Sequence, residues 1–318
     1  MPRLTVVVPA YNEAAVLESF HARLSRTLDE LPLECDVLYI DDGSSDHTWA
    51  LIEGLRARDP RTGGIKLSRN FGKEAALTAG LDHVDADAAV VIDADLQDPP
   101  ELIPSLVEQW QAGFDVVYAT RTARAGESGF KRLTAALFYR SMERLSDTRV
   151  PRDTGDFRLL SRRALAALRQ LRERQRFMKG LFAWIGYRQT AVYYLREPRQ
   201  AGQTKWNYWR LMQLAIEGIT SFSTAPLRLA TWTGVFSSLL AFLYGLWVFG
   251  KAVVFGDPVH GYPSLMVVIL FIGGVQLLAL GVIGEYLGRN YAESKQRPLY
   301  FIEEQRPAKA QGDAGHAR

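Results

Sequence analysis

The sequence is poor in cysteine and lacks two familiar signals. Cys35 is the single cysteine among 318 residues, which excludes an internal disulfide and fits a reducing compartment. No signal peptide is expected, because the first residues lead directly into the strand-like run 4–8. No glycine fingerprint follows that run, and this disfavours a Rossmann cofactor site.

Charge is missing from two long stretches near the carboxyl end. Residues 229–250 and 262–284 contain 22 and 23 residues without a charge, and about 20 are needed to cross a bilayer core. Basic residues flank these stretches at Lys205, Arg210, Arg228, Arg289, Lys295 and Arg297, whereas the connecting loop holds only Lys251 and Asp257. By the positive-inside rule, the sequence predicts a membrane hairpin at 228–288 with both termini cytoplasmic.

The net charge of +3 hides an uneven distribution. Residues 1–120 carry 9 Lys/Arg and 21 Asp/Glu, a net of −12, whereas residues 121–210 carry 21 and 7, a net of +14. A basic segment of this kind predicts an anionic partner, which could be nucleic acid, a phosphorylated substrate or lipid headgroups. Because the hairpin places the chain at a membrane, we favour the last two and expect no nucleic-acid partner.

Short apolar runs alternate with amphipathic stretches in the first half of the chain. Strands are expected at 5–8, 36–40, 65–67, 88–92 and 115–119, and helices at 13–28, 48–58, 73–81 and 99–109. This alternation predicts an α/β fold with a doubly wound, mostly parallel sheet. The expected organisation is a cytoplasmic domain at 1–206, a juxtamembrane amphipathic helix at 207–227, the hairpin and a cytoplasmic tail at 289–318. A second amphipathic helix, at about 130–145, would lie at the membrane surface or pack on the domain core.

Polar residues gather where four of the expected strands end, at 9–13, 41–44, 68–73 and 93–97. The carboxyl ends of parallel strands share one edge of a sheet, where α/β proteins bind ligands. Considered alone, each of these loops has the residue composition of an ordinary turn. The oxygens of Asp93, Asp95 and Gln97 suit Mg²⁺ or Mn²⁺, which can in turn grip a diphosphate. Together the loops predict a nucleotide crevice with a metal at its floor.

These loops carry a resemblance to family 2 glycosyltransferases of the GT-A fold, specifically the polyprenyl-phosphate glycosyltransferases. The stretches that match the family are 8–13, 40–44, 67–73, 93–100, 155–159, 202–206 and 218–223. The resemblance extends to about Arg297. The two-helix end most resembles the undecaprenyl-phosphate glucosyltransferases, which belong to the same group as dolichyl-phosphate mannose synthase.

The resemblance implies roles for individual residues. Donor binding is implied for Pro9, Tyr11, Glu13, Asp42, Arg69, Lys73, Asp93, Ala94, Arg199 and Lys205. Contacts with the acceptor phosphate are implied for Arg121, Lys131 and Arg132. Asp95 and Gln97 would coordinate Mg²⁺ or Mn²⁺. The catalytic set would be Asp93, Asp95 and Asp156, with Asp156 as a candidate base.

The reaction that the resemblance implies is inverting transfer of one hexose to a polyprenyl phosphate at the bacterial inner membrane. UDP-glucose and undecaprenyl phosphate are the expected pair, with GDP-mannose, aminoarabinose and N-acetylhexosamine donors left open, as is a homo-oligomer. A processive synthase would need a Gln-x-x-Arg-Trp motif that this chain lacks, and a non-catalytic scaffold is disfavoured by the intact Asp93, Asp95 and Lys205. The lipid phosphate, whose second pKa is about 6, carries its own charge and needs little proton abstraction.

Overall fold

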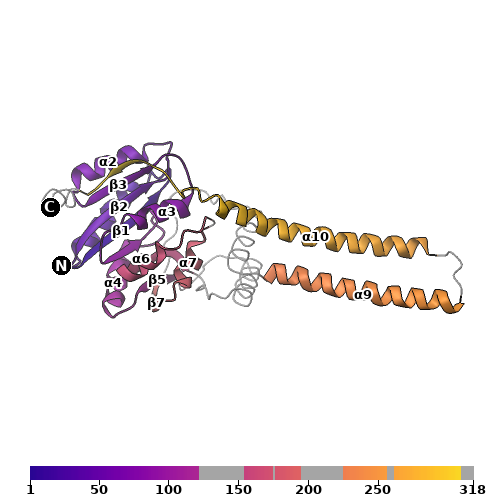
Figure 1. The fold of residues 1–318 in the computed structure, drawn as a ribbon. Coiled ribbons are helices and arrows are strands. Elements are labelled where there is room, and N and C mark those ends of the chain that lie inside the picture. The colour runs from indigo at the N-terminus through magenta and orange to yellow at the C-terminus, as the bar shows by residue number, and fades with distance from the viewer. Residues whose placement is uncertain (122–153, 175, 195–224, 256–260, 309–318) are drawn as a thin grey trace.

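The protein is described by a computed structural model that covers residues 1–121, 154–174, 176–194, 225–255 and 261–308. The helices predicted at 130–145 and 207–227 lie outside these residues. The strands are β1 (Arg3–Ala10), β2 (Glu34–Asp41), β3 (Thr62–Leu67), β4 (Ala88–Val91), β5 (Val116–Arg121), β6 (Thr154–Ser161), β7 (Gln189–Tyr194) and β8 (Ile302–Arg306). They form one eight-stranded sheet in the order β7-β5-β6-β4-β1-β2-β3-β8 (Figure 1).

Helices cover both faces of this sheet, as the alternation of runs predicts. The helices of this domain are α1 (Leu17–Asp29), α2 (Thr48–Arg58), α3 (Lys73–Asp82), the 3₁₀ turn η1 (Pro100–Leu102), α4 (Ile103–Gln111), α6 (Arg162–Leu168) and α7 (Met178–Trp184). On β1, Val6 and Val8 face a core shared with α1, α2 and α4, whereas Val7 faces a core shared with α3, α6 and α7. Successive side chains on a strand point to opposite faces of the sheet. A strand with a helical layer on each face therefore needs apolar residues at consecutive positions, as at Val6–Val8.

The α/β prediction is confirmed, and the sheet is mixed. β1 pairs in parallel with β2 and β4, β2 with β3, and β5 with β7. β6 runs antiparallel to β4 and β5, and β8 runs antiparallel to β3. Helix α1 begins at Leu17 and not at Glu13, because the backbone N–H of Glu13 bonds Thr48 Oγ1 and the chain turns before the helix starts.

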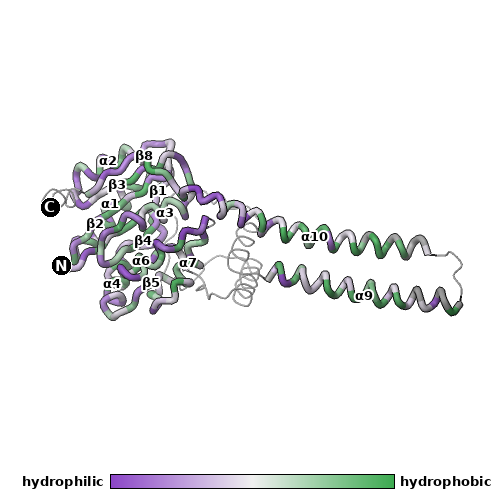
Figure 2. The backbone as a smooth tube through the Cα atoms, in the orientation of Figure 1, coloured by the Kyte–Doolittle hydropathy of each residue, from purple (hydrophilic) through white to green (hydrophobic). Residues whose placement is uncertain are grey.

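Two long helices, α9 (Ala225–Phe255) and α10 (Tyr262–Ser294), extend side by side away from the sheet domain (Figures 1 and 2). Both are apolar along most of their length, with candidate spans at Pro226–Trp247 and Val267–Ser294. In the most apolar 18-residue stretch of each helix, only 11% of the residues in the first span and 0% in the second are buried, so these side chains face outward. Each helix is thus long and apolar enough to cross a membrane, and neither is the covered core helix of a globular domain.

After α10 the chain returns to the sheet, which the prediction of a simple tail at 289–318 did not include. Residues up to Ser294 still belong to α10, and β8 then adds the outermost strand beside β3. Tyr300 donates a hydrogen bond from its hydroxyl to Asp82 Oδ2 at 2.9 Å, which fastens the returning segment to the end of α3. The sheet domain is therefore attached to the hairpin by an ordered carboxyl-terminal segment.

Candidate active site

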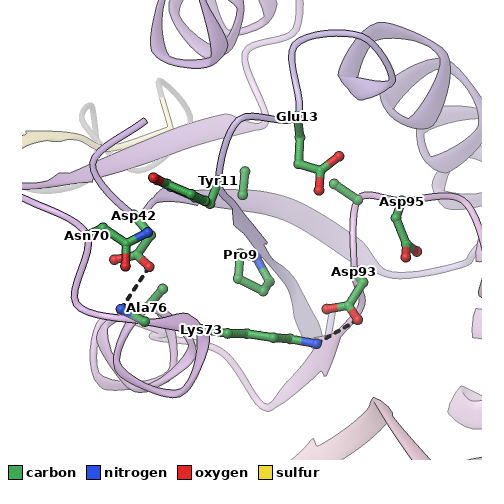
Figure 3. A pocket seen from close by; sticks show the side chains of 12 residues that line it. Pro9, Tyr11, Glu13, Asp42, Asn70, Lys73, Ala76, Asp93 and Asp95 are labelled. Atoms are coloured by element: carbon green, nitrogen blue, oxygen red, sulfur yellow. Dashed lines mark hydrogen bonds and ion pairs between the residues drawn. The ribbon is translucent and has the colours of Figure 1, made fainter. Parts of the chain in front are cut away.

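A cavity of about 320 Å³ opens at the carboxyl ends of β1, β2, β3 and β4 (Figure 3). This is the edge at which the sequence predicts a nucleotide crevice. Its walls are formed by Pro9, Ala10, Tyr11, Glu13, Asp42, Asn70, Gly72, Lys73, Ala76, Asp93, Ala94 and Asp95. Tyr11 is 46% exposed, so one aromatic face is available to a ligand.

The loop after β1 is held against the loop after β2 by reciprocal hydrogen bonds. The backbone N–H of Asn12 donates to Ser44 Oγ at 3.0 Å, and Asn12 Oδ1 accepts from the backbone N–H of Ser45 at 2.9 Å. Asn12 has a φ of 56°, a conformation that asparagine tolerates better than most residues. These bonds fix Tyr11 and Glu13 on one wall of the cavity before any ligand arrives.

Asp42 holds the loop after β3. Its two carboxylate oxygens accept hydrogen bonds from the backbone N–H groups of Phe71 at 2.8 Å and Gly72 at 3.0 Å. Burial raises the pKa of Asp42, and these two bonds offset only part of that rise. Gly43, with a φ of 64°, lies so close to the backbone of Arg69 that no side chain fits there. Asp42 therefore shapes the cavity wall as well as lining it.

Lys73 is the centre of the charged floor. Its Nζ lies 2.6 Å from Asp93 Oδ2 and 2.5 Å from Asp156 Oδ2. In Figure 3 its side chain extends past Pro9 toward Asp93. Burial by itself would lower the pKa of Lys73, but the two carboxylates outweigh burial and raise it, so the amine stays protonated.

The two carboxyl groups bound to Lys73 differ in their environments. Burial raises the pKa of Asp93, with Lys73 opposing that rise. For Asp156 burial also acts upward, but Lys73 and then Lys179 outweigh it and hold the pKa of this carboxyl well below its usual range. Asp156 Oδ1 is buried and has no hydrogen-bond partner among the residues that the structure describes. A carboxylate this acidic is a weak base, which does not favour the predicted base role.

Glu74, next to Lys73 on α3, completes the charged layer behind the floor. Burial and the nearby Asp156 raise the pKa of Glu74 to about 7, although Lys73 acts in the opposite direction. Glu74 Oε2 accepts a hydrogen bond from the backbone N–H of Met178 at 3.2 Å. Its carboxyl group therefore titrates close to neutral pH.

The turn 93–97 brings Asp95 to the cavity. Asp95 Oδ1 accepts a hydrogen bond from the backbone N–H of Gln97 at 3.1 Å, and Leu96 between them has a φ of 57°. Such a conformation is unfavourable for leucine and is maintained here because the Leu96 side chain is buried in the core. The packing of Leu96 therefore sets the direction in which Asp95 points.

Most of the predicted donor residues lie together. The cavity brings together Pro9, Tyr11, Glu13, Asp42, Lys73, Asp93 and Ala94, with Asp95 of the predicted metal pair. Arg69 and Gln97 are not among its lining residues, and Asp156 reaches it through Lys73. Arg121 ends β5, and its side chain, like Lys131, Arg132, Arg199 and Lys205, falls outside the described part of the chain.

Four lining residues were not predicted, namely Ala10, Asn70, Gly72 and Ala76. Asn70 and Gly72 lie in the 67–73 stretch that carried the resemblance, so the signal was present without a role attached to it. Ala10 likewise lies in the 8–13 stretch, whereas Ala76 lies on α3 outside every stretch that carried a prediction of site residues. Both contribute small side chains that leave room for a ligand.

A mixed sheet covered by helices, a charged cavity at its carboxyl edge and a long apolar hairpin fit the GT-A glycosyltransferase class that the sequence predicts. Residues 5–169 match the family described as Glycosyl transferase family 2, and residues 225–289 match the GtrB C-terminal hairpin. The chain belongs to glycosyl transferase family 2, which confirms the predicted family, fold and enzyme class.

Relatives are similar over nearly their whole length. The chain is 47% identical over 304 residues to the bactoprenol glucosyl transferase of Shigella phage SfV, covering 96% of this chain and 99% of that protein. It is 46% identical over 301 residues to the prophage bactoprenol glucosyl transferase homolog of Escherichia coli strain K12, covering 94% and 98%. An uncharacterized glycosyltransferase of Synechocystis sp. is 51% identical over 299 residues, covering 94% of each chain.

Proposed function

We propose that this protein transfers one glucose from UDP-glucose to undecaprenyl phosphate at the cytoplasmic face of a bacterial plasma membrane. The observation that carries the proposal is the 47% identity to a bactoprenol glucosyl transferase over 99% of that relative, hairpin included. The similarity therefore includes both the residues of the donor cavity and the hairpin that would face the lipid acceptor. The product would be a polyprenyl-linked sugar for cell-envelope glycosylation.

The cavity suits the donor half of this reaction. Tyr11 offers an exposed ring for a base, and Lys73 brings a permanent positive charge to the floor. We propose that Asp95 and Gln97 hold a divalent cation. The carboxylate of Asp95 fits Mg²⁺ or Mn²⁺, which protein sites often bind by one or two carboxylates together with substrate phosphates. When bound, such an ion withdraws charge from the leaving diphosphate.

Within the described part of the chain, side chains alone do not form a complete ligand set for an ion. Among residues that the structure describes, no group of three or more His, Cys, Asp or Glu side chains is placed to hold an ion. An ion at Asp95 would therefore take its remaining ligands from Gln97, the donor diphosphate or water. This arrangement predicts that cation and nucleotide bind cooperatively, since each supplies what the other needs.

The acceptor half needs little base catalysis. A lipid monophosphate is largely dianionic at neutral pH, because its second pKa is about 6. We propose that this dianion attacks the anomeric carbon with inversion while the nucleoside diphosphate leaves. Lys73 and Lys179 hold Asp156 ionised, and its proposed role is to fix the position of the Lys73 amine. The acceptor phosphate would then attack without a general base. Arg121, Lys131 and Arg132 are the proposed acceptor-phosphate contacts, and Arg199 and Lys205 the proposed donor-phosphate contacts.

The hairpin suits a membrane-bound enzyme. The start of α9 and the end of α10 lie at the same end of the hairpin, toward the sheet domain (Figure 1), so both termini would lie on one side of a bilayer. Basic residues flank the hairpin on that side, whereas its far end carries only Lys251, near the end of α9, and Asp257. By the positive-inside rule this asymmetry supports a cytoplasmic location of both termini.

Donor and acceptor are tested together with the full-length protein in lipid nanodiscs, Mg²⁺ and undecaprenyl phosphate. Radiolabelled UDP-glucose, UDP-N-acetylglucosamine, UDP-aminoarabinose and GDP-mannose are supplied one at a time, and the lipid products are separated by chromatography. We expect a product with one glucose per lipid from UDP-glucose. Turnover only with another donor refutes glucose, a polymer refutes single transfer, and no turnover with any donor refutes the enzymatic proposal.

A further inference from the structure

The donor cavity is supported by a segment that leaves the membrane hairpin. Strand β3 leads directly into the loop 68–72, which carries the lining residues Asn70 and Gly72 and ends at Lys73. The neighbour of β3 on its open side is β8, which follows α10 after only seven residues, 295–301. The pairing of β3 with β8 becomes irregular between Lys66 and Leu67, just before the loop begins.

Phe301, the last residue before β8, contacts this loop in two ways. Its carbonyl oxygen accepts a hydrogen bond from the backbone N–H of Ser68 at 3.0 Å. Its ring lies against the ring of Phe71, with centroids 6.3 Å apart and planes at 51°. The guanidinium of Arg69 lies 4.2 Å from the centroid of the same Phe71 ring. Phe301, Phe71 and Arg69 form one group of contacting side chains, here called the loop clamp.

The position of Phe301 is not explained by core packing, because 56% of it is exposed. An aromatic residue that remains this exposed buries little apolar surface, and its specific contacts are those with the loop 68–72. On the opposite side, Asp42 holds the same loop through the N–H groups of Phe71 and Gly72. The loop is thus fixed from within the cavity by Asp42 and from outside by Phe301.

We propose that Phe301 is a positioning residue for the nucleotide-sugar site, so that the segment leaving the hairpin completes the donor pocket. This inference rests on the proposed function. Without the clamp, the loop spends less time in the geometry that places Asn70, Gly72 and Lys73 along the cavity. The apparent affinity for the nucleotide falls in proportion to the fraction of protein in that geometry.

The test is nucleotide binding to the full-length protein in detergent, measured by calorimetry with UDP and Mg²⁺. We expect Phe301→Ala to raise the Kd for UDP by about 3- to 10-fold, as loss of an aromatic pair predicts. Phe301→Tyr, which keeps the ring, restores wild-type binding. The control is Tyr193→Ala, because Tyr193 is equally an exposed aromatic but lies on β7, the opposite edge of the sheet.

Kinetics separate positioning from general damage. Phe301→Ala is expected to raise the KM for the donor while the KM for the lipid acceptor stays unchanged, and Phe301→Leu replaces it if the alanine variant does not fold. Unaltered UDP binding in the alanine or leucine variant overturns the inference while leaving the proposed function intact. Absence of UDP binding in the wild type refutes the proposed donor itself, which is a different result.

Discussion

Lys73 and Asp156, 83 positions apart in the chain, are joined by an ion pair with an Nζ–Oδ2 distance of 2.5 Å. Lys73 is the first residue of α3, and Asp156 lies within β6, so the pair ties a helix terminus to the antiparallel strand inserted in the sheet. The same amine also binds Asp93. One cation therefore sets the charge of both carboxylates at the floor of the donor cavity.

Replacing Lys73 with methionine should remove that shared charge. Asp93 and Asp156 would then face each other without the amine that binds both, with Lys179 still acting on Asp156, and the pKa of each would rise. We expect kcat for glucose transfer to fall by about 10²- to 10³-fold, the usual effect of losing one preorganised charge. The exposed Arg162→Met variant, which loses surface ion pairs with Asp85 and Asp87, should retain wild-type kcat. Equal kcat in both variants would contradict the role given to Lys73.

The depressed pKa of Asp156 predicts how stability depends on pH. A carboxylate with a lowered folded-state pKa stabilises the fold above its unfolded pKa of about 3.9, and this contribution disappears as the pH falls through the folded value. Because Asp156 also raises the pKa of Glu74, the comparison is made in the Glu74→Gln background. The difference in melting temperature between Glu74→Gln and the double variant Glu74→Gln/Asp156→Asn should be constant from about pH 5 to 8 and shrink below about pH 4. A difference that changes between pH 6 and 8 would show that Asp156 titrates there and could act as a base.

Glu74 should behave in the opposite way. Its folded-state pKa of about 7 lies above the unfolded value, so ionising Glu74 destabilises the fold as the pH rises from about 4.5 to 7. Glu74→Gln removes this effect. Relative to wild type, the variant should gain free energy of unfolding across that window, on the order of 1–2 kcal/mol, and no more above it. Denaturant titrations at pH 5, 6, 7 and 8 measure the gain, and a gain independent of pH would refute the assignment.

Gly43→Ala tests the close contact between the loop after β2, which contains Gly43, and the loop after β3, which contains Arg69. The left-handed φ of 64° and the nearby backbone of Arg69 leave no room for a methyl group, so we expect a loss of about 1–3 kcal/mol in the free energy of unfolding. UDP binding should weaken as well. Gly54→Ala is the matched control, because Gly54 lies in α2 with open space around it and should gain up to about 1 kcal/mol. Similar destabilisation in both variants would contradict this reading.

The parts of the fold that the sequence predicts are those with strong local patterns. The apolar run at 88–92 could only be a buried strand or helix segment, and the charge-free runs could only be long apolar helices. β8 escaped prediction because Ile302–Arg306 is polar, and its partner β3 lies about 240 positions earlier. Its strand conformation comes from pairing with a sheet edge, not from any propensity of its own.

The same distinction applies to the site. Asp93, Asp95 and Asp42 were predicted because they lie in polar loops that follow apolar strands and that carry the family resemblance. The bond between Lys73 and Asp156 depends on β6 entering the sheet antiparallel to β4, which no spacing in the sequence reveals. The helices α9 and α10 also extend past the charges Lys251 and Glu285 that marked their expected ends. Long charged side chains can reach water from within a helix, so they do not have to terminate it.

The most direct test of the central claim is the initial rate of glucose transfer from UDP-glucose to undecaprenyl phosphate by Asp95→Asn beside wild type, at saturating Mg²⁺. The variant should melt at the wild-type temperature, yet its rate should be about 10³-fold lower, because the cation and diphosphate lose their charged anchor. A folded Asp95→Asn protein with the wild-type rate would contradict the assignment of this cavity as a metal-assisted donor site.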